Sequence, residues 1–505
     1  MRGPSSSHCA AAWRIGRLAR DLMEGRIEEV LIEFDSHGSL ATTHASQGSD
    51  MGLYGGLLGW AATDERLADS SRAIKQADLK VKISIRDFGD EHPNTYRLTL
   101  RNSTEQHTMT ALSTGGGMIE VIEVDGVQVT MAGDYYETLV YLESGGSELL
   151  DRLSESIAAD AIILHSGADK HIVQIKAQRF FDSKAMAHLS PYGIQRIKTI
   201  SPVLPVLSRQ GMAVPFITCQ ELLRYNQDEH LDLWELAVHY ESARGNLSQA
   251  QVLQKMREIV TIMQTSILEG VQGTDYADRI LGFQSGRYRS RMENHQLLDG
   301  GMLNQIILYV TAMMEVKSSM GVIVAAPTAG SCGGLPGACI GAASAMGLAL
   351  DDMAKAMLAA GMIGVFIAAH ATFAAEVGGC QAECGAGSGM AAAALVTLAR
   401  GSSQQAIDAA SMALQNILGM VCDPVASRVE VPCLGRNVMA ASNALACANM
   451  ALAGYDPVIP LDEVIETMDR VGQSLPRELR CTALGGLSTT KTSKEIEKRL
   501  QERVS

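Results

Sequence analysis

Three cysteines in the last third of the chain stand in loops rather than in regular helices. Cys422 and Cys433 lie in the segment "VCDPVASRVEVPC" (residues 421–433), which also contains Pro424 and Pro432. Cys380 lies in the glycine-rich segment "EVGGCQAECGAGSGM". Proline fixes the backbone of a loop, and glycine lets the backbone approach a bulky group. These loops therefore favour a site that holds such a group rigidly.

Three explanations for these thiols stay open from the residues alone. Free cysteines are commonly buried as small hydrophobic side chains. A zinc site is disfavoured, because no CxxC pair occurs and no histidine stands near either loop in the sequence. An iron–sulfur cluster takes thiolates from separate loops, and glycine-rich backbone supplies N–H groups for its sulfides. Three thiolates would leave one iron open, and an open iron is a Lewis acid for a substrate oxygen.

Length and charge limit the classes of protein to consider. A chain of 505 residues predicts two to four domains. With 42 basic against 56 acidic side chains the chain is not expected to bind nucleic acid, so its substrate should be a small molecule. The ten cysteines and the lack of a standard secretion leader predict a cytoplasmic protein. The apolar run 357–375 has the length of a membrane span, but its Ala and Gly content predicts a buried helix, so no membrane partner is expected.

The pattern of apolar residues and turn residues changes twice along the chain. Residues 1–133 mix alternating apolar segments with glycine-rich turns, which indicates an α+β domain. Residues 134–206 predict the order β-α-β-β-α-β of the ferredoxin-like fold, with "SKAMAHL" as its second helix. Residues 207–505 are helical, rich in Ala, Gly and Met. The expected fold is multidomain: an α+β domain, a ferredoxin-like domain and an all-α catalytic domain.

Several longer motifs resemble one family. "APTAGSCGGLPG", "AEVGGCQAECGAGSGMAAAAL", "CDPVASRVEVPCLGRN" and "RCTALGGLSTT" resemble the α region of the iron–sulfur L-serine dehydratases (L-serine ammonia-lyases). "GPSSSH", "EHPNTYRLTL" and "STGGGMIEV" resemble their β region, in the same chain order. The resemblance implies a cytosolic lyase that forms pyruvate and ammonia from L-serine with a 4Fe-4S cluster held by Cys380, Cys422 and Cys433, and without pyridoxal phosphate.

The resemblance also implies substrate residues. His92 and Ser113 are the expected catalytic residues. The expected contacts to the amino-acid substrate are Ser5, Ser6, Ser7, His8, Asn94, Thr114 and Arg436. Residues 134–206 resemble ACT regulatory domains, with Gly145 and Gly146 at the first strand-to-helix turn. The alternative is that this domain is a spacer that only mediates dimerisation. In either case a homodimer is expected.

The chain departs from the family pattern at several positions. Gln47 stands where a histidine is expected, and glutamine is no base at neutral pH, so His44 is the substitute candidate. Cys9 stands where the family has a threonine. It is either a tolerated near-isostere of that threonine or a thiol exposed beside the site. The motif "GPSSSH" begins only two residues after Met1, whereas the family has a leading strand before it, which suggests a truncated amino end or a misplaced start codon.

The family pattern also includes, in some relatives, a last cysteine that acts as a removable fourth ligand. The chain ends "QERVS", so Cys384 and Cys481 are the available substitutes. Two other functions stay open: a lyase for another β-substituted amino acid such as cysteine or threonine, and a non-catalytic amino-acid or redox sensor.

Overall fold

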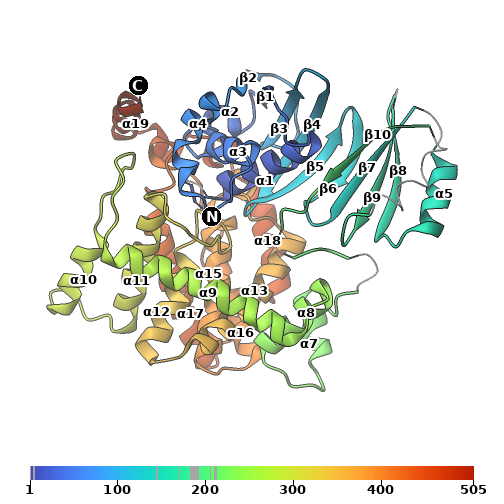
Figure 1. Ribbon diagram of the computed structural model, residues 1–505. Helices are drawn as coiled ribbons and strands as arrows, with labels where there is room; N and C mark the ends of the chain where they lie inside the picture. The colour runs from blue at the N-terminus through green and yellow to red at the C-terminus, as the bar shows by residue number, and fades with distance from the viewer. Residues whose placement is uncertain are drawn as a thin grey trace.

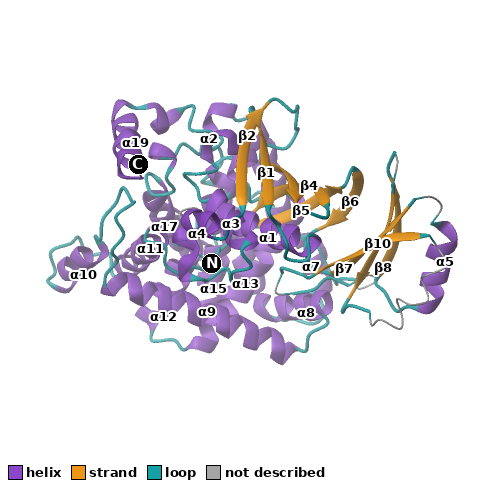
Figure 2. Ribbon diagram, turned by 45° about the horizontal axis from the view of Figure 1, so that its top comes forward, coloured by secondary structure: helices purple, strands orange, loops and turns teal. Residues whose placement is uncertain are grey.

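The computed structural model describes residues 2–3, 6–143, 146–168, 170–181, 193–204, 206–209 and 213–504. It consists of a part that contains the sheets and a larger helical body (Figure 1). The strands gather on one side of the molecule, and most of the helices lie on the other side (Figure 2). The predicted multidomain architecture, with an α+β amino-terminal region and a helical carboxyl-terminal region, is confirmed at this level.

The first domain is one sheet with helices packed on it. Its elements are α1 (Ser6–Leu22), β1 (Glu29–Asp35), α2 (Leu40–Thr43), α3 (Ser49–Leu57), α4 (Ser70–Gln76), β2 (Lys80–Arg86), β3 (Thr95–Arg101), β4 (Gln106–Gly115), β5 (Met118–Val124) and β6 (Val127–Met131). The strand order is β2-β1-β3-β4-β5-β6. Only the pairing of β1 with β2 is parallel among these strands.

Helices α1 and α3 touch through their backbones. A Cβ atom at Gly52 would lie 2.1 Å from the carbonyl oxygen of Cys9, so only glycine permits the contact. Cys9 is fully buried there, and burial raises the pKa of its thiol to about 12. Of the two interpretations of Cys9, the structure therefore supports the near-isostere and not an exposed thiol.

The middle domain is an antiparallel sheet with the strand order β10-β7-β9-β8. Its elements are β7 (Tyr136–Leu142), α5 (Ser147–Ser156), β8 (Ala161–Ser166), β9 (His171–Ala177) and β10 (Ile194–Ile200). Leu149 and Leu153 of α5 share a small core with Val140 and Val173 on one sheet face. The expected helix "SKAMAHL" and Gly145 lie outside the described residues.

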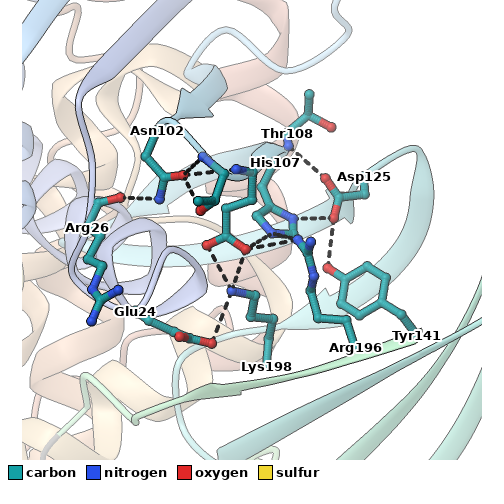
Figure 3. Close-up of polar contacts among 11 residues, drawn as sticks. Glu24, Arg26, Asn102, His107, Thr108, Asp125, Tyr141, Arg196 and Lys198 are labelled. Carbon is teal, nitrogen blue, oxygen red and sulfur yellow. Dashed lines mark hydrogen bonds and ion pairs between the residues drawn. The ribbon is translucent and has the colours of Figure 1, made fainter. Parts of the chain in front are cut away.

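The other face of the middle sheet packs on the first domain through a polar network (Figure 3). Lys198 of β10 is almost fully buried, and its Nζ donates to Glu24 at 3.1 Å and to Glu105 at 3.0 Å. The hydroxyl of Tyr141 in β7 donates to Asp125 at 2.8 Å. These contacts attach the middle domain to the first domain.

The helical body is built around α15. Its elements are α7 (Cys219–Tyr225), α8 (Leu233–Gly245), α9 (Gln249–Gln272), α10 (Ser285–Glu293), α11 (Met302–Ser318), α12 (Gly334–Met346), α13 (Leu350–His370), α14 (Ala375–Gly378), α15 (Cys384–Leu398), α16 (Ser403–Gln415), α17 (Cys433–Leu452), α18 (Leu461–Ser474) and α19 (Lys491–Val504). Small side chains let α12, α13, α16 and α17 pack closely against α15.

Helix α13 contains most of the apolar run 357–375. It is long and apolar enough to cross a membrane, but 67% of its most apolar window is buried inside the protein. The run is thus a largely buried core helix, as predicted, although the helix begins at Leu350 and ends at His370, earlier than the run itself.

Candidate active site

Five buried cysteines meet where the helical body faces the first domain. They are Cys380, Cys384 at the start of α15, Cys422, Cys433 at the start of α17, and Cys481. The pKa of Cys380 lies well below its usual range, because the thiols of Cys384 and Cys422 hydrogen-bond to its sulfur. The pKa of Cys422 is raised by its hydrogen bonds to Cys380 and Cys481. Cys433 lines the same cavity as Cys422 and Cys481.

Residues 421–433, here called the cysteine loop, are fixed by buried carboxylates. Asp423 accepts a hydrogen bond from Arg436 at 2.7 Å. Glu430 accepts one from the backbone N–H of Ile280 at 3.0 Å. Both acids are about 5% exposed. Charged acceptors with several donors form strong, directional contacts, so the spacing between the two loop cysteines is set from outside the loop.

Two fully buried polar side chains add further anchors. Lys317 of α11 donates from Nζ to the carbonyl oxygen of Val429 in the cysteine loop. The Oδ1 atom of Asn437 accepts from the N–H of Gly334 at 2.8 Å, and its Nδ2 donates to the carbonyl oxygen of Cys433 at 2.9 Å. The loop is therefore tied to α11 and to the start of α12.

Cys481 is held beside Cys422 by both halves of the chain. Its N–H donates to the carbonyl oxygen of Cys422 at 2.9 Å, and the N–H of Cys422 donates to the carbonyl oxygen of Leu479 at 2.8 Å. From the first domain, Ser39 donates to the carbonyl oxygen of Cys481 at 3.1 Å, and Nε2 of Gln47 donates to its sulfur at 3.4 Å. Gln47 thus contacts the thiol cluster directly.

The first domain contributes a histidine to the same place. His8 lies in the first turn of α1, and its Nε2 is 2.6 Å from Oε1 of Glu376 in α14. Both side chains are at least nine-tenths buried. Although burial opposes ionisation, the pKa of Glu376 is lowered, because His8 attracts the carboxylate and the amide of Asn94 hydrogen-bonds to it.

Two small adjoining cavities lie between these walls. His8, Glu376 and Glu383 line both of them. The first cavity is also lined by Gln47, Cys422, Cys433 and Cys481, and the second by Asn94, Ser113, Gly115 and Gly116. Each has a volume of about 10 Å³, close to the least that holds one water. An amino acid therefore fits only if the walls move apart.

Backbone contacts join the two walls beside the second cavity. Gly115, at the end of β4, forms an isolated parallel bridge with Phe373. A Cβ atom at Gly115 would lie 2.7 Å from the backbone nitrogen of Ala374, so the close approach requires glycine. Because Ser113 stands two residues before this bridge, the bridge sets its distance from α14.

Glu383 was not singled out by the sequence. Burial, the negative charge of Cys380 and that of Glu376 raise the pKa of Glu383 to about 8, and Thr328 donates a hydrogen bond to its Oε1 at 2.6 Å. Glu376 was missed in the same way, as the residue that ends an apolar run. The available signal was the placement of both acids in "EVGGCQAEC", beside Cys380 and Cys384.

The other two histidine candidates have hydrogen-bond partners within the first domain. Nδ1 of His44 is 2.8 Å from a carboxylate oxygen of Asp50. Nδ1 of His92 accepts the backbone N–H of Asn94 at 3.2 Å, and burial lowers the pKa of His92. Among the described residues that line the two cavities, neither of these histidines occurs.

Some of the remaining substrate candidates line a cavity, and others do not. Asn94 and Ser113 line a cavity. Thr114 and Arg436 are not among the described lining residues, and Arg436 pairs with Asp423 instead. Ser5 and the side chains of Ser6 and Ser7 lie outside what the structure describes.

The donor set fits a group larger than one metal ion. In a tetrahedral zinc site with bonds of about 2.3 Å, the sulfurs lie roughly 4 Å apart. In the described part of the chain, no three of these thiols lie within 4.8 Å of one another. The set that meets this limit is Asp35, His37 and Asp87, and Asp35 already accepts backbone hydrogen bonds there. The thiol cluster is compatible with an iron–sulfur group.

Comparisons with known proteins agree across both halves of the chain. Residues 228–488 match the family described as serine dehydratase alpha chain, and residues 2–123 match the one described as serine dehydratase beta chain. The chain is 35% identical to the probable L-serine dehydratase, alpha chain, of Bacillus subtilis over 56% of this chain and 95% of that relative. It is 49% identical to the corresponding protein of Latilactobacillus sakei over 36% of this chain and 87% of the relative. Along nearly its whole length, 97%, it is 25% identical to the L-serine dehydratase of Helicobacter pylori, of which 96% is covered.

Proposed function

Since the chain belongs to the serine dehydratase family, we propose that it deaminates L-serine to pyruvate and ammonia by eliminating water. The observation that carries the proposal is the pair of adjoining cavities that the thiol cluster and the His8–Glu376 wall share. Hydroxide is a poor leaving group, so the elimination needs an electrophile at the β-oxygen and a base at Cα. Opposite walls can supply these two functions. The aminoacrylate product then tautomerises and hydrolyses in water.

In this proposal Cys380, Cys422 and Cys433 hold a 4Fe-4S cluster, and pyridoxal phosphate is not needed. When bound, the cluster supplies a Lewis acid at an iron that carries no protein thiolate. The spacing and burial of the thiols support this assignment over a single zinc ion. Cys384 and Cys481 are the candidates for a removable fourth ligand that leaves this iron when substrate binds.

The second cavity offers groups for the rest of the substrate. Oδ1 of Asn94 is buried and accepts no hydrogen bond from the described residues, which suits a substrate ammonium. Ser113 and the N–H groups of Gly115 and Gly116, both with positive φ, suit the carboxylate. Further contacts proposed for the open state are Ser5, Ser6, Ser7, Thr114 and Arg436. Proton transfer from Cα falls to a histidine of the first domain: His8, His44 or His92.

We extend the proposal to the middle domain and the assembly. The β-α-β-β succession and the antiparallel strand order support an ACT-like regulatory domain. A homodimer in the cytoplasm is the proposed form of the protein.

Two other functions compete with serine deamination. A non-catalytic amino-acid or redox sensor needs no acids or histidine beside its thiols, so the lining by His8, Glu376 and Glu383 favours catalysis. Threonine and cysteine are alternative substrates, but the relatives described above are named for L-serine.

The test is purification without oxygen, followed by iron and sulfide analysis and a panel of amino acids. We expect iron and sulfide near four per chain, and keto-acid release that is fastest with L-serine. Faster release from threonine or cysteine would change the substrate and keep the chemistry. Iron-free protein with full activity, or cluster-bearing protein with no activity on any of the three amino acids, would contradict the proposal.

A further inference from the structure

Two carboxamide oxygens of the first domain are buried without a hydrogen-bond donor. Oε1 of Gln47 and Oδ1 of Asn94 accept no hydrogen bond from the residues that the structure describes, and neither residue is more than 1% exposed. Gln47 lines the first cavity, and Asn94 lines the second. Buried polar atoms are almost always paired, so an unpaired acceptor at a cavity indicates a ligand that brings a donor.

The nitrogen end of the Gln47 amide is already engaged. Its Nε2 donates to Sγ of Cys481 at 3.4 Å, and the backbone N–H of Gln47 donates to the carbonyl oxygen of Thr43 at 2.9 Å. The hydroxyl of Thr43 donates to the carbonyl oxygen of Ser39 at 2.8 Å, and the hydroxyl of Ser39 donates to that of Cys481 at 3.1 Å. The amide is therefore held in one orientation, because turning it would break the contact with Cys481.

Gln47 differs in charge from the other acceptors of the first cavity. The carboxylate of Glu376 lies 2.6 Å from His8, and Glu383 accepts a hydrogen bond from Thr328 at 2.6 Å. Both are acids of the helical body, and an ionised acid binds a cationic donor more strongly than a neutral one. The neutral oxygen of Gln47 is the better match for a neutral donor such as a hydroxyl group.

We propose that Gln47 recognises the β-hydroxyl group of the substrate by accepting its O–H at Oε1. The inference rests on the proposed function and deepens it, because it defines the substrate class as β-hydroxy α-amino acids. In the proposed elimination the β-oxygen lies beside the thiols, and Gln47 stands in the cavity that Cys422, Cys433 and Cys481 line. Asn94 stands in the other cavity, where the ammonium is placed. The two donor groups of L-serine thus match the two unpaired oxygens.

This role needs no basic group at position 47. The hydrogen of the hydroxyl stays on its oxygen while the Cβ–O bond breaks, and hydroxide leaves with the electron pair of that bond. The proton from Cα goes to a separate base, so Gln47 neither gains nor loses a proton. An amide, which is no base at neutral pH, is therefore sufficient where a histidine was expected.

The same contact predicts which analogues the site rejects. An S–H group is a weak donor, so L-cysteine gains little from Oε1 of Gln47. A site built to hydrogen-bond a substrate hydroxyl discriminates strongly against an analogue that lacks it. L-Threonine carries the same hydroxyl, so Gln47 does not exclude it.

The test compares L-serine with β-chloro-L-alanine, which eliminates chloride and has no hydroxyl. Wild type, Gln47→Met and Gln47→Glu are loaded with cluster without oxygen, and kcat/KM is measured for both amino acids. We expect Gln47→Met to lower kcat/KM for L-serine about tenfold to a hundredfold, the effect of leaving one buried hydrogen bond unmade. The value for β-chloro-L-alanine should change much less. Gln47→Glu keeps the acceptor oxygen and should retain most of the preference for L-serine.

Binding without turnover gives an independent readout. α-Methyl-L-serine and 2-aminoisobutyrate have no α-proton, and they differ only in the hydroxyl group. Isothermal titration calorimetry should give a lower Kd for α-methyl-L-serine with the wild type, and equal Kd values for the two compounds with Gln47→Met. Equal Kd values in the wild type would contradict the proposal.

A matched control is another fully buried glutamine. Nε2 of Gln174 in β9 donates to Glu137 at 3.0 Å, and its Oε1 lies 2.7 Å from Nε2 of His165. Gln174 is not among the described residues that line the two cavities. Gln174→Met should lower the melting temperature and leave the preference for L-serine unchanged.

Different failures of this test are distinguishable. A cluster-bearing wild type that forms no pyruvate from L-serine overturns the proposed function, while the Kd comparison still tests Gln47. Equal losses for the two amino acids in an active Gln47→Met overturn the role of Gln47 alone, because a structural defect affects both substrates. Loss of the preference in Gln47→Glu as well would assign the effect to the contact with Cys481 and overturn the acceptor role.

Discussion

At the scale of single residues, Asp35 shows how one buried carboxylate fixes a functional loop. It accepts the backbone N–H groups of His37 at 2.7 Å, Phe88 at 2.8 Å and Asp90 at 3.1 Å. Although burial opposes ionisation, these bonds lower its pKa to about 2. The segment that they hold leads directly into His92 and Asn94, so Asp35 acts on the substrate wall from a distance.

We predict that Asp35→Asn lowers the free energy of unfolding by about 1.5–3 kcal/mol at pH 7, the range for a hydrogen-bonded charged group. The pKa of about 2 lies below the ordinary value of 3.8, so the stabilisation is complete above about pH 4 and is lost as the pH falls through about 2. Urea unfolding at pH 7, pH 5 and pH 3 checks this. An equal difference at all three values would contradict the ionic origin.

Individual site residues were predictable only where their loops carried a local signal. Cys380, Cys422 and Cys433 stand in glycine- and proline-rich interruptions of helical sequence, and the structure brings them together. The contact of Gln47 with Cys481 joins positions 434 residues apart, and no local pattern encodes it. His44 was the nearest histidine in sequence, yet the turn after α2 directs its ring to Asp50.

At the scale of elements, the cysteine loop is a short segment whose shape is imposed by its neighbours. The carboxylate of Glu430 and the amine of Lys317 hold it to other segments, while its prolines restrict the backbone. Under the proposed function, this fixed loop would lower the entropy cost of ordering two thiolates around a cluster.

We predict that Glu430→Ala weakens cluster retention without unfolding the helical body. The variant leaves the N–H groups of Ile280 and Leu281 without their acceptor and frees the loop. Iron per chain after anaerobic gel filtration should fall by at least half, while the circular dichroism spectrum stays unchanged. Glu463→Ala, an exposed acid of α18, is the control. Full iron retention in Glu430→Ala would show that the loop needs no anchor at this point.

Element types were predictable from periodicity, whereas their ends and pairings were not. The Ala- and Gly-rich run 357–375 was recognisable as a helix, but its continuation back to Leu350 depends on the capping interaction of Asp352 with the N–H of Ala349. Likewise, alternating residues indicated the strands of the first domain, while the parallel pairing of β1 with β2 depends on the chain passing through α2, α3 and α4 between them.

At the scale of the whole molecule, the candidate site forms where the first domain meets the helical body. The middle domain is attached to the sheet of the first domain. The network around Lys198 crosses that attachment (Figure 3). We predict that Lys198→Met lowers the free energy of unfolding by about 3 kcal/mol or more, because Glu105 loses a buried partner. Differential scanning calorimetry checks this, with the exposed Lys170→Met as control. A loss no larger than that of the control would show that the network does not hold the domain.

The central claim is that the thiol cluster holds an iron–sulfur group at which L-serine is deaminated. Mössbauer spectroscopy of protein loaded with ⁵⁷Fe, recorded with and without L-serine, tests it most directly. The account predicts a four-iron cluster in which one iron changes its spectrum when serine is added, and loss of that cluster in Cys422→Ser. A wild-type protein that takes up no cluster, or a cluster whose spectrum is the same with and without serine, would contradict the account.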